Sequence, residues 1–222
     1  MLYKNKKYKL LVILFILGNL FCQAQYQSVE DFIPNGYVLY DTIYGDLNKD
    51  KLDDCILIVK ETYKENIVTN RFDEIVDRNR RGIIILFKNE NGYQKATENL
   101  NCFSSENEDG GAYYPPQLSF DVKRGNLIIH YAHGRYGWWK YTFRYQDSNF
   151  KLIGYDHTNG GVVTNYETSI NFLTKKKLYR KNINEESEDN DEVFVDTWSK
   201  IKIDKLLNLS EIKDFEELEM NY

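Results

Sequence analysis

Oxygen-bearing side chains gather at regular spacing in one short segment, residues 45–54. Counting Asp46 as position 1, they stand at positions 1, 3, 5 and 9. Calcium takes about six to eight oxygen ligands at about 2.3–2.6 Å, and alternate spacing turns successive side chains toward one ion. We therefore predict a calcium site, with four side chains and one backbone carbonyl as ligands: Asp46, Asn48, Asp50, Asp54 and the carbonyl of Leu52.

The predicted ion has a structural role, because a shell filled by protein oxygens leaves little room for a substrate. Three carboxylates suit a divalent cation and would repel one another without it. An EF-hand is excluded, because Leu57 stands where that motif has glutamate and a strand follows in place of a helix. The alternative is an acidic surface turn without metal, since Asp and Asn are ordinary turn residues.

The loop resembles the calcium loop of FG-GAP (integrin-propeller-like or VCBS-type) repeats, in which such a sequence joins two strands of one blade. The resemblance covers residues 40–60. Lys51 stands where that family usually has glycine, and the chain carries a single copy, so no closed propeller is implied. More loosely, the loop and the downstream residues 129–145 resemble a group of secreted bacterial proteins, which implies location and fold but no activity.

A second group of residues combines aromatic rings with a histidine and an arginine beside two glycines. Its members are Tyr131, His133, Arg135, Tyr136, Trp138 and Trp139. Tyr, Trp and Arg dominate binding hot spots, so the group predicts recognition of a protein partner, as in an inhibitor or immunity-type protein, or of a glycan. The alternative is core packing. Because side chains alternate along a strand, at most one of the two tryptophans belongs to the core.

No arrangement of residues specifies a catalytic site. His130 and His133 are three apart on an expected strand and point to opposite faces, so they do not share a zinc ion. A serine nucleophile elbow is absent from the sequence. A hydrolase needs two carboxylates about 5–10 Å apart, and no spacing singles out such a pair. We expect a non-enzymatic protein and keep the hydrolase as a second alternative.

The first residues predict export. Four lysines precede an apolar run, and Cys22-Gln23-Ala24 ends it with small residues at both positions that signal peptidase reads. The run is too short to span a bilayer, so residues 1–24 are interpreted as a signal peptide and 25–222 as a single β-rich domain in the periplasm or outside the cell. A lipid anchor through Cys22 is the alternative.

The remaining composition excludes one class of partner. Residues 1–24 contain four lysines and no acidic residue, so without them the formal charge falls from −5 to −9. Such a domain repels phosphate backbones, and we expect no nucleic-acid partner and no stable membrane span after cleavage.

Two cysteines, Cys55 and Cys102, remain after the signal peptide is removed. An oxidising compartment would permit a disulfide between them, and a buried free thiol is the alternative for Cys55.

Strand-favouring segments separated by turns predict an all-β fold, mainly antiparallel, sandwich-like or a propeller fragment, with minor helix. Residues 55–60 and 82–87 are apolar on both faces and are expected in the middle of a sheet. Residues 118–155 alternate and turn as a meander. Residues 66–80 permit a short helix, and Asp214 with Glu217 forms a capping-box pattern before another.

Overall fold

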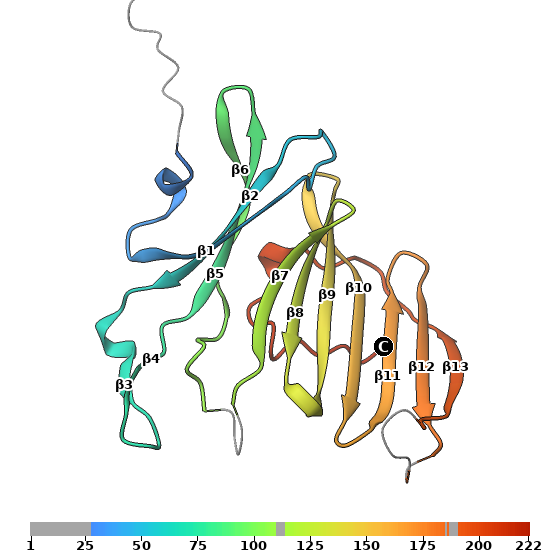
Figure 1. The fold of residues 1–222 in the computed structure, drawn as a ribbon. Coiled ribbons are helices and arrows are strands. Elements are labelled where there is room, and N and C mark those ends of the chain that lie inside the picture. The colour runs from blue at the N-terminus through green and yellow to red at the C-terminus, as the bar shows by residue number, and fades with distance from the viewer. Residues whose placement is uncertain (1–27, 110–113, 185, 187–190) are drawn as a thin grey trace, which may run out of the picture.

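The structure is a computed structural model that describes residues 28–109, 114–184, 186 and 191–222. The predicted signal peptide and Cys22 lie outside these residues. Antiparallel strands and four short 3-10 helices make up the described chain, which confirms the all-β prediction with minor helix (Figure 1). The elements are η1 (Val29–Phe32), β1 (Tyr37–Gly45), β2 (Asp54–Glu61), η2 (Lys64–Asn66), β3 (Ile67–Thr69), β4 (Ile75–Asp77), β5 (Arg81–Asn89), β6 (Gly92–Phe103), β7 (Gln117–Lys123), β8 (Asn126–Ala132), η3 (Gly134–Tyr136), β9 (Gly137–Gln146), β10 (Asn149–Gly160), β11 (Thr164–Asn171), β12 (Lys176–Asn182), β13 (Phe194–Lys200) and η4 (Leu209–Glu211).

The first sheet has four strands in the order β1-β2-β5-β6. Every residue of β2 is buried, and β5 is buried over its first six residues, as expected for strands that are apolar on both faces. The short helix permitted by residues 66–80 does not form. That segment is a small hairpin of β3 and β4, in which Asn70 accepts backbone N–H groups of Phe72 and Glu74 at the turn.

The second sheet has seven strands in sequential order, from β7 at one edge to β13 at the other. Two-residue turns with positive φ join several of its strands: Arg124 and Gly125 between β7 and β8, and Asp147 and Ser148 between β9 and β10. Turns of this kind match the right-handed twist of a hairpin, which explains the sequential meander.

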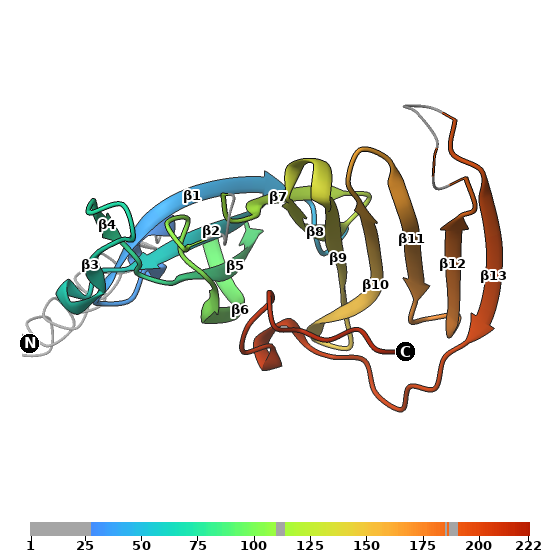
Figure 2. The ribbon, with the colours of Figure 1, turned by 90° about the horizontal axis from the view of Figure 1, so that it is seen from below.

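The two sheets share one hydrophobic core. Ile56 and Ile83 of the first sheet belong to the same buried cluster as Leu127 and Phe143 of the second, together with Phe215 from the C-terminal segment. Figure 2 shows the sheets meeting along β1 and β7, with the C-terminal segment running across the inner face of the second sheet. Two sheets on one core are closer to the sandwich-like alternative than to a propeller.

The seam between the sheets depends on a close backbone approach. A side-chain carbon added to Gly45, at the end of β1, would lie 2.6 Å from the Cβ of Val122 on β7. Only glycine therefore allows the last residue of β1 to pack against β7 at this distance.

The capping-box prediction was wrong in its position. Residues 215–218 form no helix, whereas η4 begins after Asn208. The backbone N–H and the side-chain amide of Asn208 both donate to the Glu211 carboxylate, and the backbone N–H of Glu211 donates to the Asn208 carbonyl, so the cap forms at Asn208 and not at Asp214. Leu209 and Ile212 are both buried and pack into the core.

The possible disulfide is not formed: both cysteines are buried free thiols. Cys55 lies opposite Leu86 on β5, whereas Cys102 lies near the other end of that strand, since Phe103 pairs with Arg81. Four residues of strand correspond to about 13 Å, and a disulfide needs Cα atoms within about 7 Å. Burial raises the pKa of the Cys55 thiol to about 11.

Candidate functional site

The acidic loop between β1 and β2 is organised around its first three polar side chains. Asp46 accepts backbone N–H groups from Lys49, Asp50 and Lys51, with one N–O distance of 2.6 Å. Asn48 accepts the N–H of Asp50 at 2.9 Å. These bonds fold the loop around the residues predicted at positions 1, 3 and 5. Asp46 Oδ1 accepts two of the N–H groups, whereas Asp46 Oδ2 and Asn48 Oδ1 accept one each and retain a second lone pair.

Two lysines of this loop adopt an unfavourable backbone conformation. Lys49 and Lys51 have φ values of +67° and +74°, in the left-handed region that favours glycine. The position of Lys51 is where the resembling family has glycine. The departure seen in the sequence therefore corresponds to a real backbone strain.

Asp54 differs from the other predicted side-chain ligands in its burial. It is fully buried, and its two carboxylate oxygens accept the backbone N–H groups of Leu47, Asn48 and Lys88 at 2.8, 3.3 and 3.0 Å. Its pKa is raised, chiefly by desolvation. Within the described residues no group of three His, Cys, Asp or Glu side chains is positioned to hold a metal ion. Asp46, Asn48 and Asp50 are the predicted ligands that hydrogen bonds within the loop hold near one another.

The loop also connects the two sheets. Leu47 points into the core and is only 1% exposed. The aliphatic chain of Lys49 covers Gly125 in the β7–β8 turn, where an added side-chain carbon would lie 2.6 Å from Lys49 Cε. A change in loop conformation would therefore reach both sheets.

The aromatic and arginine residues do not form one surface. Tyr131 is fully buried, and the ring of Trp139 stacks on it with centroids 5.0 Å apart and an interplanar angle of 8°. Both side chains lie on the inner face of the second sheet, against the core. Among the described residues the buried Tyr131 hydroxyl has no hydrogen-bond partner, and burial raises its pKa. These two residues belong to packing and not to an exposed patch.

Trp138 lies on the opposite face, as alternation along the strand predicts. Its ring contacts His130 at a centroid distance of 5.6 Å, and the ammonium of Lys140 lies 5.3 Å from its centroid. Lys140 also pairs with Asp156 at 3.4 Å. This outer face carries ion pairs between neighbouring strands and is partly exposed to solvent.

The remaining three predicted residues meet at the end of the β8–β9 hairpin. His133, Arg135 and Tyr136 line a recess of about 330 Å³ together with Tyr114 and Gln117. Arg135 Nε and an Arg135 terminal nitrogen donate to the Tyr136 hydroxyl at 3.2 and 2.9 Å. His133 Nε2 lies 3.0 Å from the Tyr114 carbonyl oxygen. The sequence analysis did not predict that Tyr114 belongs to this recess. Tyr114 is 88% exposed and lies outside the hairpin in the sequence.

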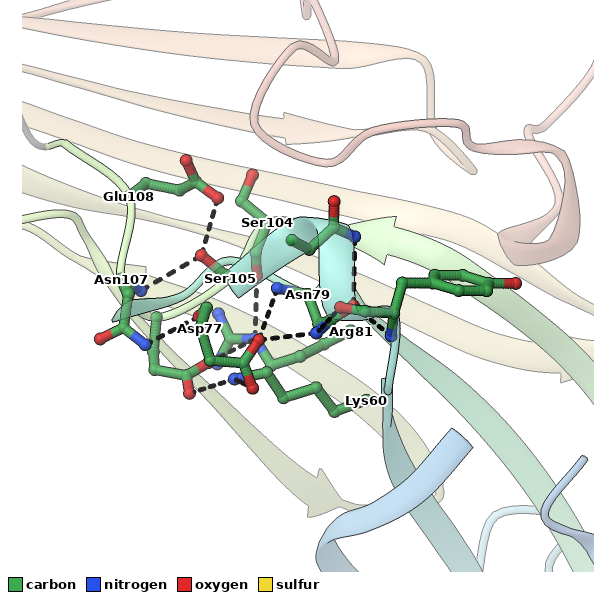
Figure 3. A network of polar contacts seen from close by, with 11 residues as sticks. Lys60, Asp77, Asn79, Arg81, Ser104, Ser105, Asn107 and Glu108 are labelled. Carbon is green, nitrogen blue, oxygen red and sulfur yellow. Dashed lines mark hydrogen bonds and ion pairs between the residues drawn. The ribbon is translucent and has the colours of Figure 1, made fainter. Parts of the chain in front are cut away.

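A buried network of charges lies at the other end of the first sheet, and sequence reasoning did not find it (Figure 3). Lys60 and Arg81 stand directly opposite each other on β2 and β5, although both are cationic and buried. Lys60 Nζ donates to Glu106 at 2.6 Å and lies 3.1 Å from Asp77, and Arg81 Nε donates to the Ser104 carbonyl. The sequence feature that could have indicated this network is a lysine near the end of an apolar strand, because a buried lysine requires acidic partners.

An acidic groove of about 640 Å³ lies beside this network and contains Arg71 and Phe72. Each of its four carboxylates has a partner in the same surface. The contacts are Glu106 with Lys60, Asp109 with Arg78, Glu108 with the Ser105 hydroxyl, and Glu74 with the Asn70 amide. Such pairing is typical of structural ion networks, and we place no acid–base pair there.

A row of rings crosses the inner face of the second sheet beyond the core. His157 stacks on Tyr155 and contacts Tyr166 at 5.6 Å, and Tyr166 contacts Tyr179 at the same distance. Tyr166 and Tyr179 line a recess of about 400 Å³ with Asn165, Lys181 and Asn182. Burial lowers the pKa of His157. The sequence gave no sign of this row, because its members come from separate strands.

Comparison with known proteins found no matching protein family, no matching curated protein and no matching solved structure. Among the described residues, no helix has both the length and the apolar character needed to cross a membrane.

Proposed function

We propose that this chain is an exported, non-enzymatic binding protein that recognises a protein partner, of the inhibitor or immunity type, through the recess at the β8–β9 hairpin. The observation that carries the proposal is the contact of Arg135 with Tyr136. Its guanidinium lies 5.2 Å from the centroid of the Tyr136 ring and donates to the hydroxyl of the same residue. An arginine held on an aromatic ring loses less side-chain entropy on binding than a mobile one.

The neighbouring residues support recognition of a protein surface. Tyr114 is exposed, and His133 connects the hairpin to it. Tyrosine and arginine around a shallow recess are the residue types that anchor protein partners. The proposed binding surface consists of Tyr114, His133, Arg135 and Tyr136, and it does not include the two tryptophans.

The test is a comparative pull-down from the exported fraction of the source cell, with wild-type protein and an Arg135→Ala/Tyr136→Ala variant as baits. We expect proteins retained by the wild type to be lost from the double variant. The matched control is Arg124→Ala, which removes an exposed arginine from the neighbouring β7–β8 turn. Equal retention by all three baits would refute the hairpin as the binding surface.

The proposal includes a structural Ca²⁺ ion bound by the loop. Asp46, Asn48, Asp50 and the Leu52 carbonyl would hold it, and Asp54 would contribute only through an oxygen that already accepts a backbone N–H. When bound, the ion neutralises the loop carboxylates. The loop hydrogen bonds described above support this assignment for three ligands.

Calcium binding is tested by thermal unfolding with added Ca²⁺ and with a chelator. A ligand at a hundred times its dissociation constant stabilises the folded state by about 2.7 kcal/mol. We expect Asp50→Ala to abolish the calcium-dependent rise in Tm, and Asp53→Ala, an exposed neighbour, to retain it. A wild-type Tm that does not respond to Ca²⁺ would identify the loop as an acidic turn.

A glycan ligand is the second candidate, favoured by the aromatic row on the inner face. Tyr166 and Tyr179, whose ring centroids lie 5.6 Å apart, line a recess together with Asn165 and Asn182, and a lining of rings and amides suits a sugar. A glycan array separates the two candidates. Binding that Tyr179→Ala removes and Arg135→Ala retains would favour the glycan; the absence of any glycan signal would eliminate it.

A further inference from the structure

β13 forms an open edge of the second sheet in the part of the chain that the structure describes (Figures 1 and 2). Ile201 donates its N–H to Lys175, and Val193 accepts the N–H of Ile183. Residues of an antiparallel strand alternate in the side to which they direct both backbone groups. The odd-numbered residues of β13 therefore bond to β12, and the even-numbered ones direct their N–H and C=O groups toward the open edge.

This edge has few of the features that usually prevent strand pairing. Its register with β12 is continuous over all seven residues, without a bulge or a proline. Trp198 is 64% exposed and Val195 is 48% exposed. Natural edges are commonly protected by proline, bulges or several charges. A regular edge with an exposed tryptophan is therefore competent to accept another strand.

We propose that β13 pairs with β13 of a second copy of this chain, antiparallel about a two-fold axis at Trp198. In this register Asp196 lies opposite Lys200 of the second copy, and the two-fold repeats the pair, so opposite charges meet twice. Thr197 lies opposite Ser199, and Trp198 opposite Trp198. Centring the axis on Asp196 would place two aspartates face to face instead. The strand is thus complementary in charge to itself in one register only.

The backbone geometry agrees with this register. Trp198, Asp196 and Lys200 are all even-numbered, so their free N–H and C=O groups face the second copy as hydrogen-bonded pairs. Asp196 is already oriented on the outer face, because Arg180 Nε donates to it at 3.1 Å. The result is one sheet continuous across two molecules, with the hairpin recess at the far edge of each copy left open.

The test is sedimentation analysis of the full chain over a range of concentrations, with charge-exchange variants. Lys200→Asp and Asp196→Lys each place like charges opposite each other, and we expect each to raise the dimer Kd by about tenfold, because cross-strand charge pairs contribute in both signs. The Asp196→Lys/Lys200→Asp double variant restores opposite charges and should restore dimerisation. Circular dichroism and Tm show whether each variant is folded, and Lys200→Asp leaves the Arg180 contact intact.

Hydrogen exchange identifies the interface independently. The amides of Asp196, Trp198 and Lys200 should become protected as concentration rises, whereas amides of β1, an edge of the other sheet, should not change. A wild-type chain that stays monomeric at all concentrations would overturn self-pairing and leave the edge to a strand of another protein. A dimer that no single variant weakens, or that the double variant does not restore, would overturn it equally.

Discussion

Asp54 offers the sharpest test of how the acidic loop is held. Its carboxylate is buried at the junction of the loop with β2 and accepts three backbone N–H groups, from Leu47, Asn48 and Lys88. Replacing Asp54 with alanine removes both acceptor oxygens and with them all three hydrogen bonds. A hydrogen bond to a charged group contributes about 1.5–3 kcal/mol, and part of the loss is offset because the desolvated carboxylate is also removed. We expect Asp54→Ala to lower the free energy of unfolding by about 3–4 kcal/mol.

Asp54→Asn provides the intermediate case. Asparagine keeps one acceptor oxygen and presents an N–H₂ group toward donors, so we expect a loss of about 2 kcal/mol. Asp53→Ala is the matched control, because Asp53 is exposed and a surface change costs within about 0.5 kcal/mol. Urea unfolding in the presence of a chelator measures these differences without any contribution from calcium. A loss below about 1 kcal/mol for Asp54→Ala would refute the assigned hydrogen-bond role.

Three other changes test separate parts of the structure. Lys51→Gly removes a left-handed lysine and should raise the free energy of unfolding by about 0.5–1 kcal/mol, measured by urea unfolding. Trp139→Ala deletes the ring stacked on Tyr131 and should cost about 2–4 kcal/mol; a fully stable variant would place Trp139 outside the core. Burial lowers the pKa of His157, so the unfolded state binds more protons than the folded state below about pH 6.5, and stability should fall as pH drops through that value. His157→Gln should reduce this fall in Tm between pH 7.5 and 5; an unchanged profile would exclude His157 as a contributor.

The strands and their burial could be predicted from local pattern. Residues 55–60 and 82–87 are apolar on both faces, and they form the buried strands β2 and β5. Alternation placed Trp138 and Trp139 on opposite faces. Turn residues fixed the hairpins of the meander, because positive φ is needed at Arg124, Gly125 and their counterparts.

The composition of the sites could not be predicted in the same way. The hairpin residues are close together in sequence, but consecutive side chains of a strand point to opposite faces of the sheet, and residues of a turn lie on neither face. The group is therefore divided among the core, the outer face and the recess. Asp54 follows the spacing of a ligand, yet one of its three backbone donors, Lys88 on β5, reaches it only after the first sheet forms. The charge network at Lys60 and the aromatic row at Tyr166 join residues from distant strands.

The sequence by itself determined the strands, the turns and the position of the acidic loop, because each depends on the conformational preference and side-chain alternation of a few consecutive residues. Only the tertiary structure decided which groups meet: the separate burial of Cys55 and Cys102, the capture of Asp54 by three N–H groups, and the open edge of β13. These contacts depend on the order in which the strands pair and on how the two sheets pack around one core. No short segment of the chain encodes either feature.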